Sequence, residues 1–446
     1  MASFARADAS HKYNRRWLSG SPLSRLDEPE VQRICQEQGL HFRDTKLSPG
    51  RTVKYFGWQV LAGNVSCDAV AHHADGAFTA SAYCQARQRL PLGVLKEVSD
   101  QIAAEALSVA NAGSEHLWRG HRTFRIDGSG TRLPDSREVR QYFGCSGNCR
   151  PGCSYPTAHL LLLVGAGGVG LEVICSPLRT GDMTHASKMH RHLSSGDVLI
   201  GDGLFGSCCH LHSLMRQQLH GVFPMHHSRK IAWGSNADQG PNRRFVKSLG
   251  WYDQLVEYRK PAERPEWMSA KEFKAVPQWI QVREVRRQVM VGGARRTITL
   301  VTTLCDPLKY PAKALVKLLG ERWTIEVNLR SFKTTMGGER LHCQTVDGVK
   351  KELLMYLIVY NLVRLLMLEA AARQRVPFDR ISFADALMRL RHGTDLEIWV
   401  DLKINPLRPG RIEPRVVKRR PKPYPTMGRP RAAMRRRILL RRKAAA

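Results

Sequence analysis

The amino-acid sequence predicts an α/β protein with helices before its core, a β-rich insertion inside the core and a basic tail after it. Three observations carry this prediction. Apolar residues recur at helical spacing in residues 1–115. β-rich stretches then alternate with a helical stretch in residues 116–225, and a hairpin pattern interrupts the alternation in residues 226–308. Strands followed by alternating helices and strands are typical of an α/β core.

Residues 1–115 are expected to form a small helical domain, with DNA binding as its expected role. Ser48 followed by Pro49 is typical of a helix start, because serine caps a helix and proline suits its first turn. No clear helix-turn-helix pattern is visible. Three helices are expected, at residues 27–39, 49–63 and 90–112.

Residues 116–225 are expected to form the first part of the core. A β-rich stretch ends at Asp127, and the Gly-Ser-Gly sequence at 128–130 predicts a turn after it. A short apolar run ends at Asp202, as expected of a buried strand. The expected elements are strands at 123–127, 159–164, 170–176, 197–202 and 221–225, with the second and third paired as a hairpin, and a helix at 184–193.

Residues 226–308 are expected to be a β-rich insertion. Stretches rich in β-forming residues at 279–291 and 297–304 flank a glycine-containing turn, which predicts a β-hairpin. Arg295 and Arg296 lie at its tip, where a solvated turn and a phosphate contact are the two interpretations.

Residues 309–400 are expected to form the second part of the core. Pro311 can begin a helix and Gly337-Gly338 must end one, so a single helix is expected between them. A mostly apolar helix is expected at 350–373.

Basic residues greatly outnumber acidic ones. The 446 residues include 70 Lys and Arg and 39 Asp and Glu, which gives a net charge of +31. Such a surplus attracts phosphate backbones without sequence preference. In the tail, residues 401–446, the stretch from Arg408 to Lys443 holds 15 Lys and Arg and one acid, Glu413. With its many prolines, this stretch is expected to be an extended, largely disordered basic arm.

Cysteine usage and hydropathy indicate a cytoplasmic protein, associated with the nucleoid through its charge. The 11 cysteines are scattered, Cys208 and Cys209 are adjacent, and the N-terminus has no signal-peptide pattern. Polar residues such as Glu172 and Arg364 interrupt the longest apolar runs. Neither run reaches the roughly 20 apolar residues that a membrane span needs, so no membrane partner is expected.

One expected helix carries a single carboxylate within a row of cations. At about 100° per residue, Arg322, Glu326, Arg330 and Lys333 lie at roughly 0°, 40°, 80° and 20° around the helix. They therefore share one face. An acid surrounded by cations suits a metal ion beside a polyanionic backbone, whereas accidental ion pairs on a solvated face are the alternative.

Three carboxylates have positions that suit metal binding: Asp127 and Asp202 at expected strand ends, and Glu326 on the basic helix. Acids at strand ends face the crevice where ligands of α/β sheets bind. Carboxylate oxygens are ligands that Mg²⁺ and Mn²⁺ prefer, and two ions about 4 Å apart can hold both reacting oxygens in phosphoryl transfer. Either aspartate alone has a plainer interpretation as a turn former or cap.

These residues resemble the DDE transposases of bacterial insertion sequences, whose helix has the signature Y-x2-R-x3-E-x6-K. Arg322, Glu326 and Lys333 match it in type and spacing, and Leu319 occupies the tyrosine position. The 75 residues from Asp127 to Asp202 and the 124 from Asp202 to Glu326 match the family's β-strand insertion. The segments 118–135 and 201–205 look like its first two motifs.

The resemblance implies a ribonuclease-H-like core, with Asp127, Asp202 and Glu326 as catalytic residues and ligands of two Mg²⁺ or Mn²⁺ ions. It also implies double-stranded DNA as the partner, both transposon ends and target, and a homodimer when the ends are synapsed. By resemblance and charge, the expected DNA-binding residues are Arg322, Arg330, Lys333, Arg295 and Arg296. A nuclease of the same fold and an inactive, DNA-binding descendant are the alternatives.

The tyrosine of the signature contacts transposon-end phosphates in this family. Leu319 is expected to share the basic face, at about 60° on the same scale, but leucine cannot make this contact.

Four further patterns have plain interpretations that we favour over functional ones. The Gly-rich stretch 165–170 fits a dinucleotide motif but is followed by a β-like segment. The cysteines at 145, 149 and 153, with His159, could bind zinc but lack the usual zinc spacing, so a glycine-rich loop is favoured. Histidines at 185, 190, 192, 226 and 227 are expected at the surface or beside phosphate, and the tryptophans at 251 and 279 in the core.

Overall fold

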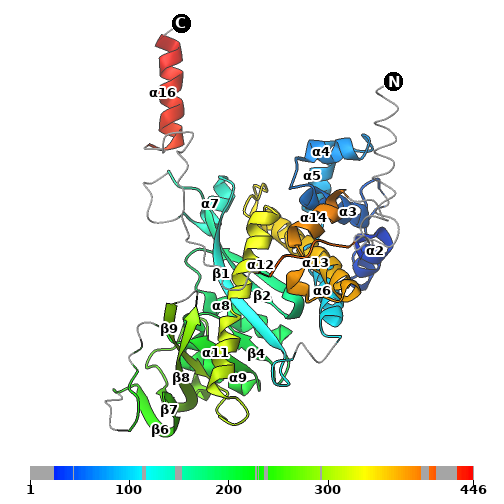
Figure 1. The fold of residues 1–446 in the computed structure, drawn as a ribbon. Coiled ribbons are helices and arrows are strands. Elements are labelled where there is room, and N and C mark those ends of the chain that lie inside the picture. The colour runs from blue at the N-terminus through cyan, green and yellow to red at the C-terminus, as the bar shows by residue number, and fades with distance from the viewer. Residues whose placement is uncertain are drawn as a thin grey trace.

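The protein is described by a computed structural model, which covers residues 25–43, 45–112, 117–145, 153–226, 229, 231–235, 240–291, 294–392, 401–407 and 429–444. Its described residues form one nine-stranded mixed sheet in the order β3-β2-β1-β4-β5-β9-β8-β7-β6, with helices packed around it (Figure 1). The predicted α/β class is confirmed.

The N-terminal helices share a hydrophobic cluster with a long helix from the C-terminal half, α13 (Val346–Gln374). The three predicted helices are present, and two short ones that the sequence analysis missed lie between them. Ser66 and Thr79 cap these two by accepting hydrogen bonds from backbone N–H groups in their first turns. The five are α2 (Glu28–Glu37), α3 (Pro49–Leu61), α4 (Cys67–His73), α5 (Ala80–Arg89) and α6 (Leu92–Ala110).

Helix α13 is long and apolar enough to cross a membrane, but 89% of its most apolar window is buried inside the protein. Its apolar residues pack against α3, α6 and the sheet, which accounts for their composition. The helix is the central element of the larger hydrophobic core.

The central strands are covered by helices on both faces. Leu160 and Leu162 of β2 pack in the cluster of α13, whereas Leu161 and Leu163 pack in the cluster of the helices that follow the central strands. β1 and β5 flank β4 in parallel, and β1, β2 and β3 are antiparallel. These elements are β1 (Thr123–Arg132), α7 (Arg137–Phe143), β2 (Thr157–Val164), β3 (Gly170–Pro177), α8 (Asp182–Met189), β4 (Val198–Ile200), α9 (Cys208–Arg216) and β5 (His220–Pro224).

The turn predicted at residues 128–130 is wrong, because β1 continues through it. Arg125 to Arg132 pair with β2 along the whole stretch. At Gly128 an added Cβ would lie 2.8 Å from the His159 ring, so glycine there permits a close approach between strands. Asp127 therefore lies in mid-strand and not at a strand end.

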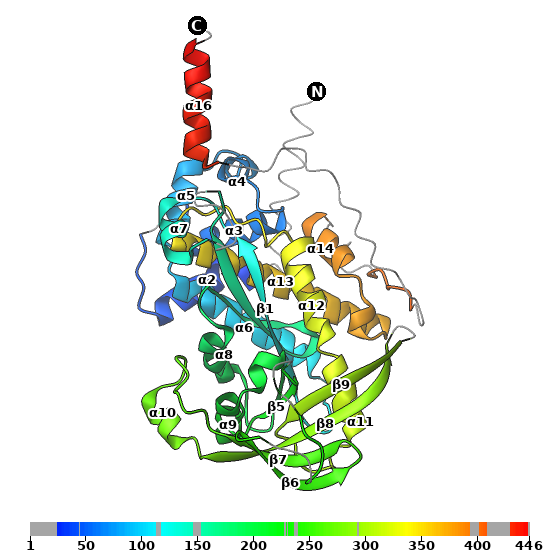
Figure 2. The ribbon, with the colours of Figure 1, turned by 90° about the vertical axis from the view of Figure 1, so that its left-hand side faces the viewer.

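Residues of the β-rich segment extend the core sheet. Its hairpin is confirmed, and β9 pairs antiparallel with the core strand β5, so both parts belong to one sheet (Figure 2). Buried ion pairs between Arg283 and Asp253 and between Arg243 and Glu284 link its strands. The elements are β6 (Arg243–Gly250), β7 (Asp253–Arg259), α10 (Ala270–Ala275), β8 (Trp279–Val291) and β9 (Ala294–Thr302).

The single helix predicted after Pro311 is divided into α11 (Ala312–Gly320), α12 (Trp323–Arg330) and a π-helical turn, η6 (Ser331–Thr335). At the junction the backbone N–H groups of Arg322 and Ile325 donate to carbonyls three residues back, over 3.0 and 3.1 Å. Such tightened turns rotate the helix face, so α11 and α12 do not share one continuous face. Gly337, at φ +86°, follows the helical turns as expected.

Leu319 is not on the basic face, because α11 turns it into the core. It is 6% exposed and packs with Val198, Ile200 and Val222 of the parallel strands. The expectation that it shares a face with Arg322 is wrong, since the helix phase changes between the two residues.

Replacing Leu319 with tyrosine is therefore expected to destabilise the protein. A larger side chain forced into a packed core costs about 1–3 kcal/mol, and a buried hydroxyl without a partner adds to that. Chemical denaturation of Leu319→Tyr and of Leu308→Tyr, which changes a leucine that is 89% exposed, would measure this. Tighter binding of element ends by Leu319→Tyr at unchanged stability would contradict the core assignment.

The predicted disordered tail is wrong for its last part. Residues 408–428 lie outside the described part of the chain, but Arg431–Ala444 form a helix, α16. Pro430 is the last proline, and the alanine, arginine and leucine residues after it have high helix propensity. Most of the described side chains of α16 are exposed.

Candidate active site

Asp127 lies on β1 beside the point where the shorter strand β4 has ended. β4 pairs with β1 only from Thr123 to Arg125, and β1 continues past it. The neighbours Phe124 and Ile126 pack into the cluster on the other face. Because side chains alternate along a strand, Arg125 and Asp127 project toward the α12 side.

Asp202 lies two residues after the end of β4 and caps the short helix η5 (Gly203–Gly206). Its Oδ1 accepts a hydrogen bond from the backbone N–H of Leu204 over 2.8 Å. Asp127 accepts one in the same way from the N–H of Gly128 over 2.9 Å. Both carboxylates are held by local backbone and emerge at the carboxyl end of β4.

Arg322 joins this strand edge to the helix. Its Nη1 lies 3.9 Å from Asp127 Oδ2, and its Nη2 lies 3.7 Å from Glu326 Oε1. The guanidinium therefore lies between one carboxylate from the sheet and one from α12. Both distances are long for direct hydrogen bonds, so Arg322 interacts mainly through charge.

The electrostatics of Asp127 link all three predicted acids. Burial raises its pKa, the Gly128 N–H and Arg322 lower it, and the charges of Asp202 and Glu326 raise it further. The pKa of Asp202 is also raised, mainly by burial. The pKa of Asp127 therefore responds to both other acids, and Arg322 lowers the pKa of Asp127 and of Asp202 alike.

The described residues contain no group of three His, Cys, Asp or Glu side chains arranged closely enough to hold a metal ion. The donor set nevertheless fits hard divalent cations, because it offers carboxylate oxygens and no sulfur. The like-charge interaction at Asp127 is the other feature that fits, since a cation among these acids would offset it.

The predicted DNA-binding residues lie in different settings. Lys333 Nζ donates to Ser129 Oγ over 2.8 Å and to the Gly130 carbonyl over 2.7 Å, and burial lowers its pKa. Arg330 is exposed on α12. Arg295 and Arg296 are exposed at the start of β9, so the structure brings only Arg322 and Lys333 of this set against β1.

Asp182 and His159 are neighbours of the site that the sequence analysis missed as site residues. His159 Nε2 and Asp182 Oδ1 are in contact, and both side chains lie over Gly128, where an added Cβ would be 3.1 Å from Asp182 Oδ2. Asp182 also raises the pKa of Asp202 by its charge. The helix predicted at 184–193 began two residues after Asp182, which is the first residue of α8. His159 reaches this position only because β1 pairs with β2.

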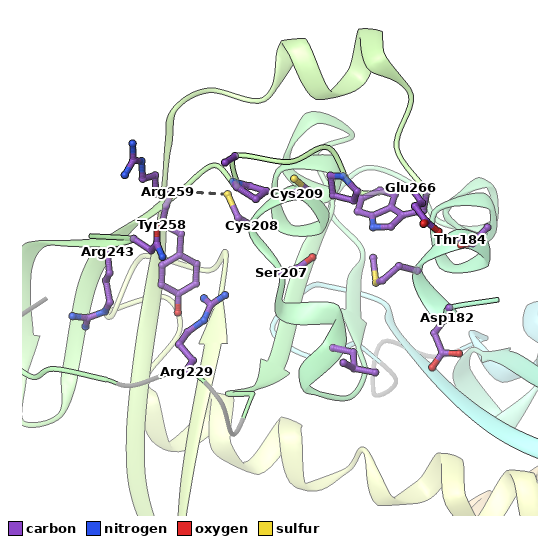
Figure 3. A pocket seen from close by; sticks show the side chains of 18 of the residues that line it. Asp182, Thr184, Ser207, Cys208, Cys209, Arg229, Arg243, Tyr258, Arg259 and Glu266 are labelled. Carbon is purple, nitrogen blue, oxygen red and sulfur yellow. Dashed lines mark hydrogen bonds between the residues drawn. The ribbon is translucent and has the colours of Figure 1, made fainter. Parts of the chain in front are cut away.

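Asp182 also lines a cavity of about 1210 Å³ between α8, α9 and the β-rich segment (Figure 3). Arg229, Arg259 and Tyr258 line it as well, and the Arg229 guanidinium lies 4.0 Å from the centre of the Tyr258 ring. Asp182 thus links the site of Asp127 and Asp202 to a cavity that basic and aromatic side chains line.

Removing the charge of Asp182 is expected to change how the site responds to acid. The pKa of Asp202 should fall in Asp182→Asn, because the negative charge of Asp182 no longer raises it. Burial would still hold this pKa above its ordinary value. Less proton competition for Asp202 should move the acid limb of the cleavage–pH profile to lower pH at limiting metal. Single-turnover cleavage at a series of pH values measures this, with the exposed Asp68→Asn as control. An unchanged acid limb would contradict the coupling.

The structure confirms one of the remaining sequence expectations and corrects two others. The strand β3 and not a helix follows the glycine-rich stretch, so it is no dinucleotide motif. His190, expected at the surface, is buried, and its Nε2 lies 3.0 Å from His210 Nε2. Trp251, expected in the core, is 81% exposed. Residues 149 and 227 lie outside the described part of the chain.

Acids on a mixed sheet beside a basic helix suit phosphoryl transfer on nucleic acid. The family model described as "Transposase DDE domain" matches residues 118–362, more than half of the chain. The chain belongs to this family, and it is a DDE transposase, an enzyme of DNA phosphoryl transfer. The resemblance noted in the sequence is confirmed.

Two curated relatives come from Escherichia coli (strain K12). The chain is 26% identical over 379 residues to the transposase InsG for insertion sequence element IS4, which covers 78% of each chain. It is 29% identical over 133 residues to the putative transposase InsZ, covering 28% of this chain and 42% of that one. A solved piggyBac transposase synaptic complex with hairpin DNA aligns with 10% identity, 86% and 82% coverage and a TM-score of 0.43, too low to establish a shared fold.

Proposed function

We propose that this transposase binds the ends of its own insertion sequence, cuts a strand to free a 3′-OH and joins that end to target DNA. The observation that carries the proposal is the position of Arg322, between Asp127 of the central sheet and Glu326 of α12. A scissile phosphate drawn to this guanidinium would lie beside carboxylates from two elements. The family and the IS4 relative support the same reaction.

In this proposal Asp127, Asp202 and Glu326 are the catalytic residues and hold two Mg²⁺ or Mn²⁺ ions in a ribonuclease-H-like core. The ions would supply positive charge to the attacking and leaving oxygens. The backbone N–H groups that hold Asp127 and Asp202 orient the two carboxylates. The partly buried strand edge excludes part of the solvent, which strengthens electrostatic interactions there.

The remaining predicted residues would hold the DNA backbone. Arg322 would contact the phosphate next to the scissile bond, with Lys333 and the exposed Arg330 further along the helix. Arg295 and Arg296 would contact DNA at a distance from the chemistry. All five would read phosphate and not base edges, so they would give affinity without sequence preference.

The proposed partners are transposon-end and target DNA in duplex form and a second copy of the chain when two ends are synapsed. The N-terminal helices, residues 1–115, are proposed as the part that recognises the ends, and residues 226–308 as the insertion between the core parts 116–225 and 309–400. The basic tail, 401–446, would add nonspecific affinity on nucleoid DNA in the cytoplasm.

A strand-transfer assay with the element's ends, target DNA and Mg²⁺ tests this proposal. Cutting and joining by the full chain, both lost in Asp202→Asn, would support it. Cutting without joining would replace it with a nuclease of the same fold. Binding without cutting, with Mg²⁺ or Mn²⁺, would indicate an inactive descendant.

A further inference from the structure

We propose that Arg125 is a positioning residue that sets how α12 lies along β1 and so fixes the separation of Asp127 and Glu326. The inference rests on the proposed function of those two carboxylates. Arg125 precedes Asp127 by two residues on β1, so the two side chains project to the same side of the strand.

Arg125 holds the residue that precedes Arg322. Its Nη2 donates to Glu321 Oε2 over 2.9 Å, and its Nε donates to the Glu321 backbone carbonyl over 3.3 Å. One guanidinium therefore fixes both the side chain and the main chain of a single residue. A planar fork of donors is suited to such a double contact, which lysine cannot reproduce.

Glu321 lies at the junction where α11 passes into α12. Its carbonyl also accepts from the N–H and the Oγ1 of Thr324, over 3.0 and 2.8 Å. These bonds belong to the tightened turn that sets the rotation of α12 relative to α11. By holding this turn against β1, Arg125 determines the direction in which Arg322 and Glu326 project.

A second contact holds the other end of the helical segment. Lys333 donates to Ser129 Oγ and to the Gly130 carbonyl, further along the same strand. Along β1 the order is Arg125, Asp127, Ser129, and along the helix it is Glu321, Glu326, Lys333. The Arg125–Glu321 contact thus precedes Asp127 and Glu326 along both elements, and the Lys333–Ser129 contact follows them.

The side chain of Arg125 is largely buried, at 13% exposure, whereas that of Glu321 is 43% exposed. Burial lowers the pKa of Arg125, and Glu321 opposes that effect by its charge. Two nitrogens of Arg125, Nε and Nη2, donate to Glu321, so contacts within the protein account for the orientation of this guanidinium. The position of Arg125 is explained by its role in holding the start of α12 against β1.

The test compares Arg125→Ala with a matched control, Arg122→Ala, in the full chain. Arg122 lies on the same segment and pairs with Asp197 over 2.6 Å, at the other end of β4 from Asp202. We expect Arg125→Ala to lower the single-turnover cleavage rate at saturating DNA by about 10²-fold, because small displacements of reacting groups have effects of that size. The affinity for element ends should fall much less than the rate, because Arg322 is displaced but not removed, and more Mg²⁺ should be needed for half-maximal rate.

Two further variants separate positioning from general stability. Arg125→Lys should keep part of the rate, and Glu321→Gln should lose less than Arg125→Ala because the carbonyl contact remains. Equal losses of rate and melting temperature in Arg125→Ala and Arg122→Ala would overturn the proposal, as would an unchanged rate and Mg²⁺ requirement in Arg125→Ala.

Hydrogen exchange gives a readout that does not depend on chemistry. The backbone amides of Thr324 and Ile325 should exchange faster in Arg125→Ala than in the wild-type protein or in Arg122→Ala. If the wild-type chain fails to cut element ends, the proposed function fails, and this measurement still decides whether Arg125 holds the junction. Unchanged exchange at both amides would overturn the positioning role.

Discussion

Asp127→Asn is expected to abolish DNA cleavage while leaving the binding of element ends intact. The substitution keeps the shape of the side chain and its contact with the Gly128 N–H group, but it removes the charge that a divalent ion needs. Metal ions contribute several kcal/mol to phosphoryl transfer, so a loss of about 10³-fold or more follows. Gel-shift affinity and single-turnover cleavage of the same ends measure the two properties separately.

Asp202→Asn and Glu326→Gln should show the same separation of binding from cleavage. The exposed Asp379→Asn serves as a control with an equal change of charge. Cleavage at the wild-type rate by Asp202→Asn would rule out the three-carboxylate site. Calorimetric titration with Mn²⁺, which needs no DNA, should show weaker metal binding in all three variants.

Combining Arg322→Ala with Lys333→Ala should weaken both DNA binding and cleavage severely. A hydrogen bond to a charged group contributes about 1.5–3 kcal/mol, so two lost contacts correspond to roughly 10²- to 10⁴-fold. Because these groups face backbone phosphate, the loss of affinity should be equal for cognate and scrambled ends.

The structure predicts that Arg322→Ala and Lys333→Ala, made separately, act for different reasons. Arg322 lies between Asp127 and Glu326, so its loss should act on cleavage more than on stability. Lys333 also holds Ser129 and Gly130, so its loss should lower the melting temperature as well. Arg330→Ala, at an exposed position, is the matched control with a smaller effect. Wild-type cleavage by the double variant would show that this face is merely solvated.

Local sequence patterns were sufficient to predict the secondary structure wherever neighbouring residues decide it. The start of α3 at Ser48 and Pro49, the β8–β9 hairpin and the short buried strand before Asp202 all follow from capping, turn and periodicity rules. The order of the three acids and the spacing of Arg322, Glu326 and Lys333 were equally visible, and they indicated the family before any fold was known.

Predictions failed where distant segments decide. The Gly-Ser-Gly sequence at 128–130 is a turn signal by itself, yet pairing with β2 extends the strand through it. The helix α16 was missed for a different, local reason: charge and composition averaged over the tail hid the helix-forming residues after Pro430, the last proline.

The α/β class, the family and the identities of the acids and cations could be predicted from residue type and spacing along the chain. The burial of Leu319, the position of His159 and Asp182 over Gly128, and the contact of Arg125 with Glu321 became visible in the folded protein. The physical reason is that these contacts join residues far apart in the chain. They exist only once the strands pair and the tightened turn before α12 rotates that helix toward β1.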